Sequence, residues 1–174
     1  MILINQQYAF HHRNIYTAGL GLDLHLLSKQ YYMESAISQQ LFIYSSLRKG
    51  FHKDVFKYIT HFFSFVSAAK ANGILSIIDG EPVATPAASR FIKGELYKLN
   101  KVEDFSWVFG QLDDYEGLIV EPGERPLYRR DLTTVYKDDG SITSAWIYWY
   151  NGNIIDRPVL ASGDISYNLG IENL

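Results

Sequence analysis

The chain has 174 residues, the length of a single domain with a sizeable core, and 47% of them are hydrophobic. Its 16 basic and 19 acidic side chains give a net charge of −3, so the charge does not favour nucleic acid or an anionic membrane as a partner. The absence of cysteine excludes disulfides, thiolate catalysis and the common zinc modules. No apolar run approaches the roughly 20 residues that span a bilayer, so we expect a soluble, globular protein.

Residues 1–32 show no sign of a targeting sequence. They lack the basic start, the long apolar stretch and the small-residue cleavage site of a signal peptide, so we expect a cytoplasmic protein. The sequence GLGLD at residues 19–23 lacks the third glycine of a dinucleotide-binding fingerprint, and we interpret it as a loop. We therefore predict an N-terminal extension over residues 1–32 and a functional domain over residues 33–174.

The domain begins with a strand, followed by a segment of mixed character. Residues 41–44 (LFIY) have the length and residue types of a buried strand, and residues 45–49 form its exit loop. Loops that leave a sheet have backbone N–H groups that can bind a ligand. Over residues 52–70 the apolar residues recur at helical spacing, although the later part fits a strand equally well.

Two further strands are predicted before residue 100. The first is GILSII at residues 73–78, and we expect irregular structure after it because Pro82 and Pro86 lack the backbone N–H that a sheet needs. The second is RFIKGELYKL at residues 90–99. Gly94 inside this strand indicates a bulge or the close approach of another backbone.

The second half of the domain combines a helix with a hairpin. Residues 102–117 (VEDFSWVFGQLDDYEG) predict a helix, and the segment that follows reads as two strands joined at the turn Asp138-Asp139-Gly140. Both faces of AWIYWY at residues 145–150 are apolar or aromatic, which predicts a central strand covered on both sides. From Asn153 onward we expect irregular structure.

One carboxylate of the predicted helix faces inward. At about 100° per residue, Glu116 falls near the middle of the apolar face, which is formed by Val102, Phe105, Phe109 and Leu112. Lost hydration and the negative end of the helix dipole both disfavour its charged form, so its pKa should rise toward the range of a general acid or base. Gly117 suits the left-handed position that ends a helix.

A structural role for Glu116 is the alternative. Ion pairs at helix ends are common, and three arginines follow within the next 14 residues. Under this interpretation Glu116 pairs with Arg125, Arg129 or Arg130 and has no chemical function.

Five short motifs occur in one order along residues 40–151, and together they resemble the gamma-glutamylcyclotransferase-like family, which includes the gamma-glutamylamine cyclotransferases. LFIYSSLRKG resembles the family's strand ending in Tyr-Gly-Ser/Thr-Leu-Arg, GELYKL its Gly-x-Leu-Tyr strand, and LDDYEG its Leu-Asp-x-x-Glu-Gly helix end. LYRRDLTTV and AWIYWYN match the Tyr-Arg-Arg and Ala-Trp-x-Tyr strands that follow. The resemblance implies an α+β fold with a small mixed β-barrel, flanking helices and an active-site cavity at one end.

The resemblance also implies a reaction and its residues. The free α-amine of a small-molecule gamma-glutamyl substrate attacks its own side-chain carbonyl, which closes 5-oxoproline and releases an amine or amino acid without a metal or other cofactor. Glu116 matches the family's catalytic acid/base, and Tyr128 matches a tyrosine that lines the pocket. The loop whose backbone amides hold the substrate matches Tyr44, Ser45, Ser46 and Leu47.

The chain departs from the family pattern at Ser45, where glycine is usual. If this position needs a positive φ or close contact with the ligand, serine would strain the loop or block the site. The alternative function is therefore a non-catalytic ligand-binding or protein-interaction module with a degenerate cyclotransferase pocket. The sequence does not identify the leaving amine or the oligomeric state.

Other sites have weaker support. The five histidines show no metal-ligand spacing, and there is no Gly-x-Ser-x-Gly elbow or phosphate-binding loop. Ser45 or Ser46 as a nucleophile would need a histidine base, and His52 is the nearest in sequence. We interpret the aromatic strand at residues 145–150 as core, not as a stacking platform for nucleic acid.

Overall fold

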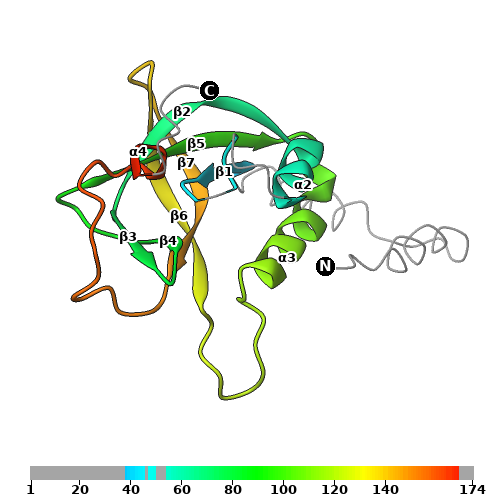
Figure 1. The fold of residues 1–174 in the computed structure, drawn as a ribbon. Coiled ribbons are helices and arrows are strands. Elements are labelled where there is room, and N and C mark those ends of the chain that lie inside the picture. Colours follow the sequence, from blue (N-terminus) through cyan, green and yellow to red (C-terminus); the bar gives the residue numbers. More distant parts are fainter. Residues whose placement is uncertain (1–37, 46, 50–53, 169–174) are drawn as a thin grey trace, which may run out of the picture. The chain divides into compact units, whose positions relative to one another are not determined.

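The structure is a computed structural model that describes residues 38–45, 47–49 and 54–168 (Figure 1). Five strands form a closed barrel in the order β1-β5-β2-β6-β7, and β3 pairs with β4 in a separate two-stranded sheet. The strands are β1 Gln40–Ile43, β2 Phe63–Asn72, β3 Ile74–Ile78, β4 Glu81–Thr85, β5 Phe91–Leu99, β6 Tyr128–Lys137 and β7 Ile142–Tyr150. The helices are α2 Asp54–Phe62, α3 Phe105–Tyr115 and α4 Ile165–Asn168, with a 3₁₀ turn, η2 Val102–Asp104, before α3.

This architecture confirms the predicted α+β fold with a small mixed barrel and flanking helices. The barrel is mixed because β1 runs parallel to β7, with Leu41 opposite Trp146, whereas the other neighbouring strands are antiparallel. In Figure 1 the helices α2 and α3 lie on one side of the barrel, and the β3–β4 hairpin lies on the other. The predicted extension over residues 1–32 lies outside the described residues.

Two apolar clusters occupy the two faces of the barrel wall. One contains Ala145, Ile147 and Trp149 of β7, together with residues of β2, β5 and the β3–β4 hairpin. The other contains Tyr148 of β7 and joins the wall to α2 and α3 through Ile59 and other buried residues. The strand over residues 145–150 is therefore covered on both sides, as predicted, because its alternate side chains enter different clusters.

The segment of mixed character divides between a helix and a strand. The helical spacing is correct up to Phe62, where α2 ends, and the strand alternative is correct from Phe63, where β2 begins. The register of β2 against β5 shifts between Phe65 and Ser67. A bulge of this kind breaks the alternation of apolar and polar residues, which is why the sequence pattern did not distinguish helix from strand here.

The prediction of irregular structure after residue 78 is wrong. Residues 81–85 form β4, which pairs with β3 through a tight turn at Asp79 and Gly80. Both turn residues have positive φ, 51° and 84°, as expected for the two-residue turn that matches strand twist. Pro82 is tolerated because β4 has only one paired neighbour, so a missing N–H on its other side costs nothing. Pro86 lies just beyond the strand.

The remaining elements agree with the sequence. β6 and β7 form the predicted hairpin, and Gly140 has a φ of 82° in its turn. Beyond Asn153 the described chain is irregular except for α4 and an isolated bridge between Ser76 and Val159. None of the helices in the described residues is long and apolar enough to cross a membrane.

Gly94 lies where β5 passes the end of β1, and it marks the predicted close approach. A Cβ atom at this position would collide with the backbone oxygen of Ile43 and would lie 2.7 Å from the ring of Phe42. Neither neighbour can move freely, since Ile43 is paired with Glu95 in the barrel and Phe42 is buried. Glycine therefore allows β5 to pack against the strand from which the exit loop leaves.

Gly94→Ala is expected to lower the free energy of unfolding by at least about 1–3 kcal/mol, the usual cost of overpacking a core. Urea denaturation of the purified protein measures this loss. Gly110→Ala in α3 is the matched control, because a Cβ there meets nothing within 4 Å and alanine favours a helix. Equal stability of the two variants would contradict the close approach.

Candidate active site

A cavity of about 30 Å³ lies where the end of β1, the end of α3 and the start of β6 meet. Each predicted site residue that the structure describes lines it, namely Tyr44, Ser45, Leu47, Glu116 and Tyr128. The rest of the lining is Leu41, Phe42, Ile43, Pro82, Leu112 and Tyr148. Ser46 lies outside the described residues. The structure thus brings together predicted site residues that are up to 84 positions apart in the sequence, from Tyr44 to Tyr128.

The end of α3 fixes the position of Glu116. Gly117 has a φ of 69°, and its N–H donates to the backbone oxygen of Asp114 at 3.1 Å. The N–H of Leu118 donates to the backbone oxygen of Asp113 at 2.8 Å. This pair of bonds is the Schellman motif, so Gly117 occupies the helix-ending position that the sequence predicts. Glu116 is the last residue before the chain turns away.

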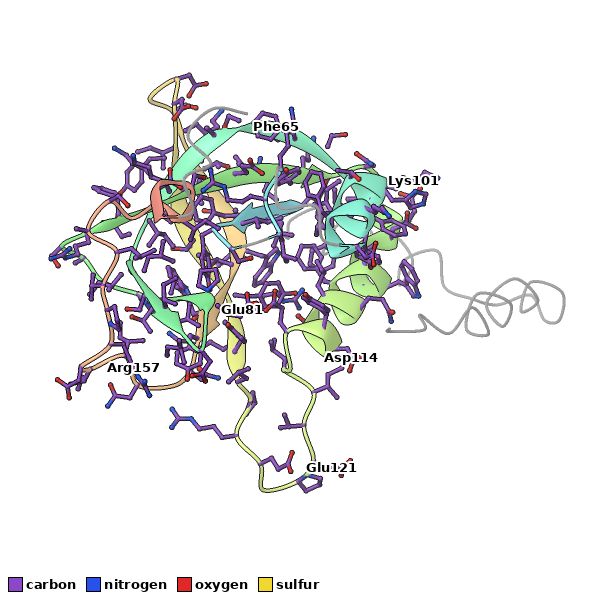
Figure 2. The ribbon with its side chains drawn as sticks, viewed as in Figure 1. Phe65, Glu81, Lys101, Asp114, Glu121 and Arg157 are labelled. Carbon is purple, nitrogen blue, oxygen red and sulfur yellow. The ribbon has the colours of Figure 1, made fainter. Side chains whose placement is uncertain are left out.

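The side chains at this helix end point in different directions. Leu112 is buried, and Glu116, one turn later, is on the same face and lines the cavity. Asp114 is exposed, and Figure 2 shows it on the side of α3 that faces away from the barrel. The helical spacing therefore placed Leu112 and Glu116 on the correct face of α3.

Burial raises the pKa of Glu116 from its ordinary value of 4.5 to about 7. The cause is desolvation, because the charged carboxylate loses water when it enters the pocket. Within the described residues no hydrogen bond or ion pair reaches its carboxylate to oppose this effect. Glu116 is therefore poised to exchange a proton near neutral pH.

The arginines that could have paired with Glu116 have other partners. Arg129 lies 2.8 Å from Asp131 and also donates to the side chain of Asn151 at 3.0 Å. Arg130 lies 3.3 Å from Asp113. The alternative of a structural ion pair to Arg129 or Arg130 is wrong, and no such pair joins Glu116 to Arg125 among the described residues.

Tyr44 forms a wall of the cavity with its ring, while its hydroxyl is engaged by the protein. The hydroxyl donates to the backbone oxygen of Tyr148 at 2.8 Å, and the backbone N–H of Ala84 donates to it. Burial raises the pKa of Tyr44 well above its ordinary value. Tyr128 is half-buried, its ring contacts that of Tyr150 at 5.7 Å, and burial followed by the charge of Glu116 raises its pKa.

Ser45 is accommodated in the loop without strain. Among the described residues other than glycine, only Asp79 and Asp156 have positive φ, so Ser45 does not adopt the conformation that would require glycine. Its backbone oxygen accepts from the N–H of Arg48 at 3.2 Å, which closes a turn. Its hydroxyl accepts weakly from the N–H of Leu47 at 3.4 Å.

Two partly buried carboxylates, of Glu95 and Asp164, anchor the exit loop. The carboxylate of Glu95 accepts from the backbone N–H of Lys49 at 3.0 Å and from the hydroxyl of Tyr97 at 2.7 Å. Arg48 lies 3.8 Å from Glu95 and donates to Asp164 at 2.9 Å. The sequence reasoning did not predict these contacts, although Arg48 and Glu95 belong to two of the recognised motifs. They hold the loop to β5 and to the segment before α4.

The sequence reasoning also missed a polar chain that reaches the cavity from α3 and β6. Tyr148 lines the cavity and its hydroxyl donates to Asp113 at 2.8 Å. Asp113 pairs with Arg130 as described above. The signal was present, since these three residues belong to the Ala-Trp-x-Tyr, Leu-Asp-x-x-Glu-Gly and Tyr-Arg-Arg motifs, but we had assigned residues 145–150 to the core alone.

Comparison with known protein families identifies the fold and its family. The family described as gamma-glutamyl cyclotransferase, AIG2-like, matches residues 41–167. The chain belongs to this family. No curated protein matches the sequence. The family match covers the whole cavity lining, from Leu41 to Tyr148.

Solved structures share the fold of the family member described here. YkqA from Bacillus subtilis has a TM-score of 0.55 and 22% identity over 78% of this chain, which covers only 42% of YkqA. An uncharacterised protein from Pyrococcus horikoshii has a TM-score of 0.51 and 20% identity over 77% of this chain and 95% of its own. An AIG2-like protein from Mus musculus has a TM-score of 0.55 and 19% identity over 71% of this chain and 86% of its own.

Because the pKa of Glu116 is raised, the folded state should become less stable as pH rises, the opposite of the usual effect of a carboxylate. Its folded pKa of about 7 lies above its ordinary value of 4.5, so the folded state holds the proton more tightly and loses stability as pH rises through this window. We expect the free energy of unfolding of Glu116→Gln, relative to the parent, to increase by about 3 kcal/mol between about pH 4 and about pH 8.

Urea denaturation of both proteins at the two pH values measures this difference. Glu124→Gln is the control, because Glu124 is an exposed carboxylate in the loop after α3. A difference between Glu116→Gln and the parent that stays constant with pH would mean that Glu116 titrates normally.

Proposed function

We propose that the protein is a cyclotransferase that converts the gamma-glutamyl group of a small molecule to 5-oxoproline and releases an amine or amino acid. One observation carries the proposal: a buried carboxylate, Glu116, has a pKa of about 7 and no ion-pair partner among the described residues, in a cavity shared with the loop after β1. Membership of the gamma-glutamyl cyclotransferase, AIG2-like family supports it.

Glu116 would act first as a base and then as an acid. Its carboxylate takes a proton from the substrate's α-ammonium, and the free amine then attacks the side-chain carbonyl carbon, which forms the new C–N bond of the ring. The tetrahedral intermediate collapses as the original amide C–N bond breaks, and Glu116 returns its proton to the leaving nitrogen. The ring nitrogen gives up its second proton to the Glu116 carboxylate, which passes it on to the released amine. A pKa near neutrality suits both steps, because the group must accept and release the same proton at one pH.

The exit loop would supply the electrostatic part of catalysis. The α-carboxylate of the substrate and the oxyanion of the intermediate need hydrogen-bond donors, which the backbone N–H groups of residues 45–47 can provide. Donors of this kind are effective when they are held in place before the substrate arrives. The contacts of Arg48 and Lys49 with Glu95 and Asp164 provide such support.

The aromatic walls would select one shape of a flexible substrate. Ring closure is intramolecular, so much of the rate comes from holding the α-amine near the side-chain carbonyl. Tyr44 and Tyr128 line the cavity, and Tyr44 is held by two hydrogen bonds to the protein. Rigid walls of this kind restrict the glutamyl chain to a folded conformation.

A binding module without turnover is the second candidate, and the loop supplies the observation that favours it. The hydroxyl of Ser45 already engages the N–H of Leu47, one of the donors that the substrate would need.

The cyclotransferase is tested by measuring 5-oxoproline release from a panel of gamma-glutamyl amines and dipeptides. We expect release from at least one compound, and we expect Glu116→Gln to lower kcat/KM by about 10²–10⁴, the usual contribution of general acid–base catalysis. Glu124→Gln is the control with an equal loss of charge and should match the parent. Unchanged turnover by Glu116→Gln would exclude this mechanism, and no release from any compound would favour the binding module.

A second test separates the hydroxyl of Ser45 from the flexibility of glycine. Because the φ of Ser45 is already accessible to any residue, Ser45→Ala and Ser45→Gly should both free the N–H of Leu47 and lower KM a few-fold. Steady-state kinetics on the best substrate measures this effect. An inactive parent that becomes active only as Ser45→Gly would show that serine has disabled the pocket.

A further inference from the structure

The hydroxyl proton of Tyr148 points away from the cavity. Tyr148 lines the cavity and is buried, and its hydroxyl lies 2.8 Å from Oδ1 of Asp113. An ionised carboxylate can only accept a hydrogen bond, so Tyr148 must donate its proton toward α3. The lone pairs of its oxygen are then available to a ligand in the cavity.

Arg130 forms an ion pair with the same Asp113 carboxylate that accepts from Tyr148. Its Nη2 lies 3.3 Å from Oδ2 of Asp113, and its guanidinium lies over the rings of Phe109 and Trp146 at 4.8 and 4.9 Å. A guanidinium does not lose its proton, and here it is held in an aromatic enclosure where the Asp113 carboxylate balances its charge. Asp113 is therefore a fixed acceptor, and the orientation of the Tyr148 hydroxyl is fixed with it.

We propose that Tyr148 accepts a hydrogen bond from the α-ammonium of the gamma-glutamyl substrate, and that Asp113 and Arg130 are positioning residues that hold Tyr148 in this orientation. The inference rests on the proposed function and adds a selection rule to it. The pocket prefers substrates whose α-amine is free and charged. Tyr148, Asp113 and Arg130 belong to three of the sequence motifs, and the proposed mechanism assigns these residues no function.

Tyr148 and Glu116 line the same cavity, so a hydrogen bond to Tyr148 can assist the transfer of a proton to Glu116. One N–H of the ammonium donates to Tyr148, and another transfers its proton to Glu116, which leaves the nitrogen lone pair free to attack the carbonyl carbon. The Tyr44 hydroxyl is already engaged by the backbone, because it donates to the backbone oxygen of Tyr148 and accepts from the N–H of Ala84. Tyr148 is thus the acceptor in the cavity whose orientation the protein sets in advance.

The test compares two ligands that differ only in the α-amine. Binding of γ-glutamyl methylamide and of glutaric acid monomethylamide, the same compound without the amine, is measured by calorimetry in the Glu116→Gln protein, where turnover is slowed. Adding Tyr148→Phe should weaken binding of the amine-bearing ligand by about tenfold to a hundredfold, the usual effect of losing a hydrogen bond to a charged group. Binding of the amine-free ligand should change by less than about twofold.

Two further variants complete the design. Asp113→Asn should show the same selective loss, because an amide can donate to Tyr148 and turn the phenolic proton toward the cavity. Tyr58→Phe is the matched control, since Tyr58 donates to the backbone oxygen of Val108 and does not line the cavity. It should change neither affinity.

The outcomes separate this inference from the proposed function. If Tyr148→Phe weakened binding of both ligands equally, or weakened binding of neither, the role of Tyr148 would be overturned even if the parent releases 5-oxoproline. A parent that neither binds nor turns over any gamma-glutamyl compound would overturn the proposed function, and this inference with it. A variant that only loosened the fold would weaken binding of both ligands. A loss of affinity for the amine-bearing ligand alone therefore identifies the positioning role.

Discussion

The desolvation of one carboxylate is the constraint on which the site depends. Glu116 lies on the apolar face of α3 in a cavity, and it keeps its raised pKa only because nearby cations are paired elsewhere. Arg129 is neutralised by Asp131 and Arg130 by Asp113. If either arginine turned toward Glu116, the attraction would favour the charged form and lower its pKa. The ion pairs around the pocket thus support the proposed function because they keep the two arginines away from Glu116.

A close contact between β5 and the end of β1 helps to bring the parts of the site together. β1 is short, and the loop that follows it must reach the end of α3 while β5 passes underneath. Gly94 makes this possible, because any side chain at that position would displace Ile43 or Phe42. The contacts of Glu95 with the loop begin one residue later on the same strand. Two adjacent residues of β5 therefore determine how β1 packs and where the exit loop lies: Gly94 allows the close contact, and Glu95 holds the loop.

Much of this arrangement could be predicted from the sequence where a periodic pattern carries the information. Helical spacing placed Glu116 inward, Gly117 marked the helix end, and apolar residues on both faces predicted that residues 145–150 form a strand covered on both sides. β4 was missed because Pro82 was given more weight than the Asp79-Gly80 turn signal before it. A proline is compatible with a strand that has a free edge, and the sequence does not show which edge is free.

The polar contacts of the site could not be predicted in the same way. Periodicity gives the face on which a side chain lies. Which hydrogen-bond or ion-pair partner it finds depends on differences of a few tenths of an ångström between atoms that the tertiary fold brings together. The sequence offered Arg130 as a partner for Glu116, and the fold pairs it with Asp113 instead. It also presented Tyr148 as one more aromatic residue of a buried strand, whereas Tyr148 lines the cavity and its hydroxyl donates to Asp113 of that ion pair.

The measurement that tests this account most directly is the titration of the Glu116 carboxyl by ¹³C NMR. The carboxyl carbons of glutamate are labelled, and the Glu116 signal is assigned by its absence from the spectrum of Glu116→Gln. The account predicts a midpoint of about 7, because burial without a neighbouring cation disfavours the charged form. A midpoint near the ordinary value of 4.5 would contradict it, since the carboxylate would then be hydrated or paired and unsuited to exchange a proton at neutral pH.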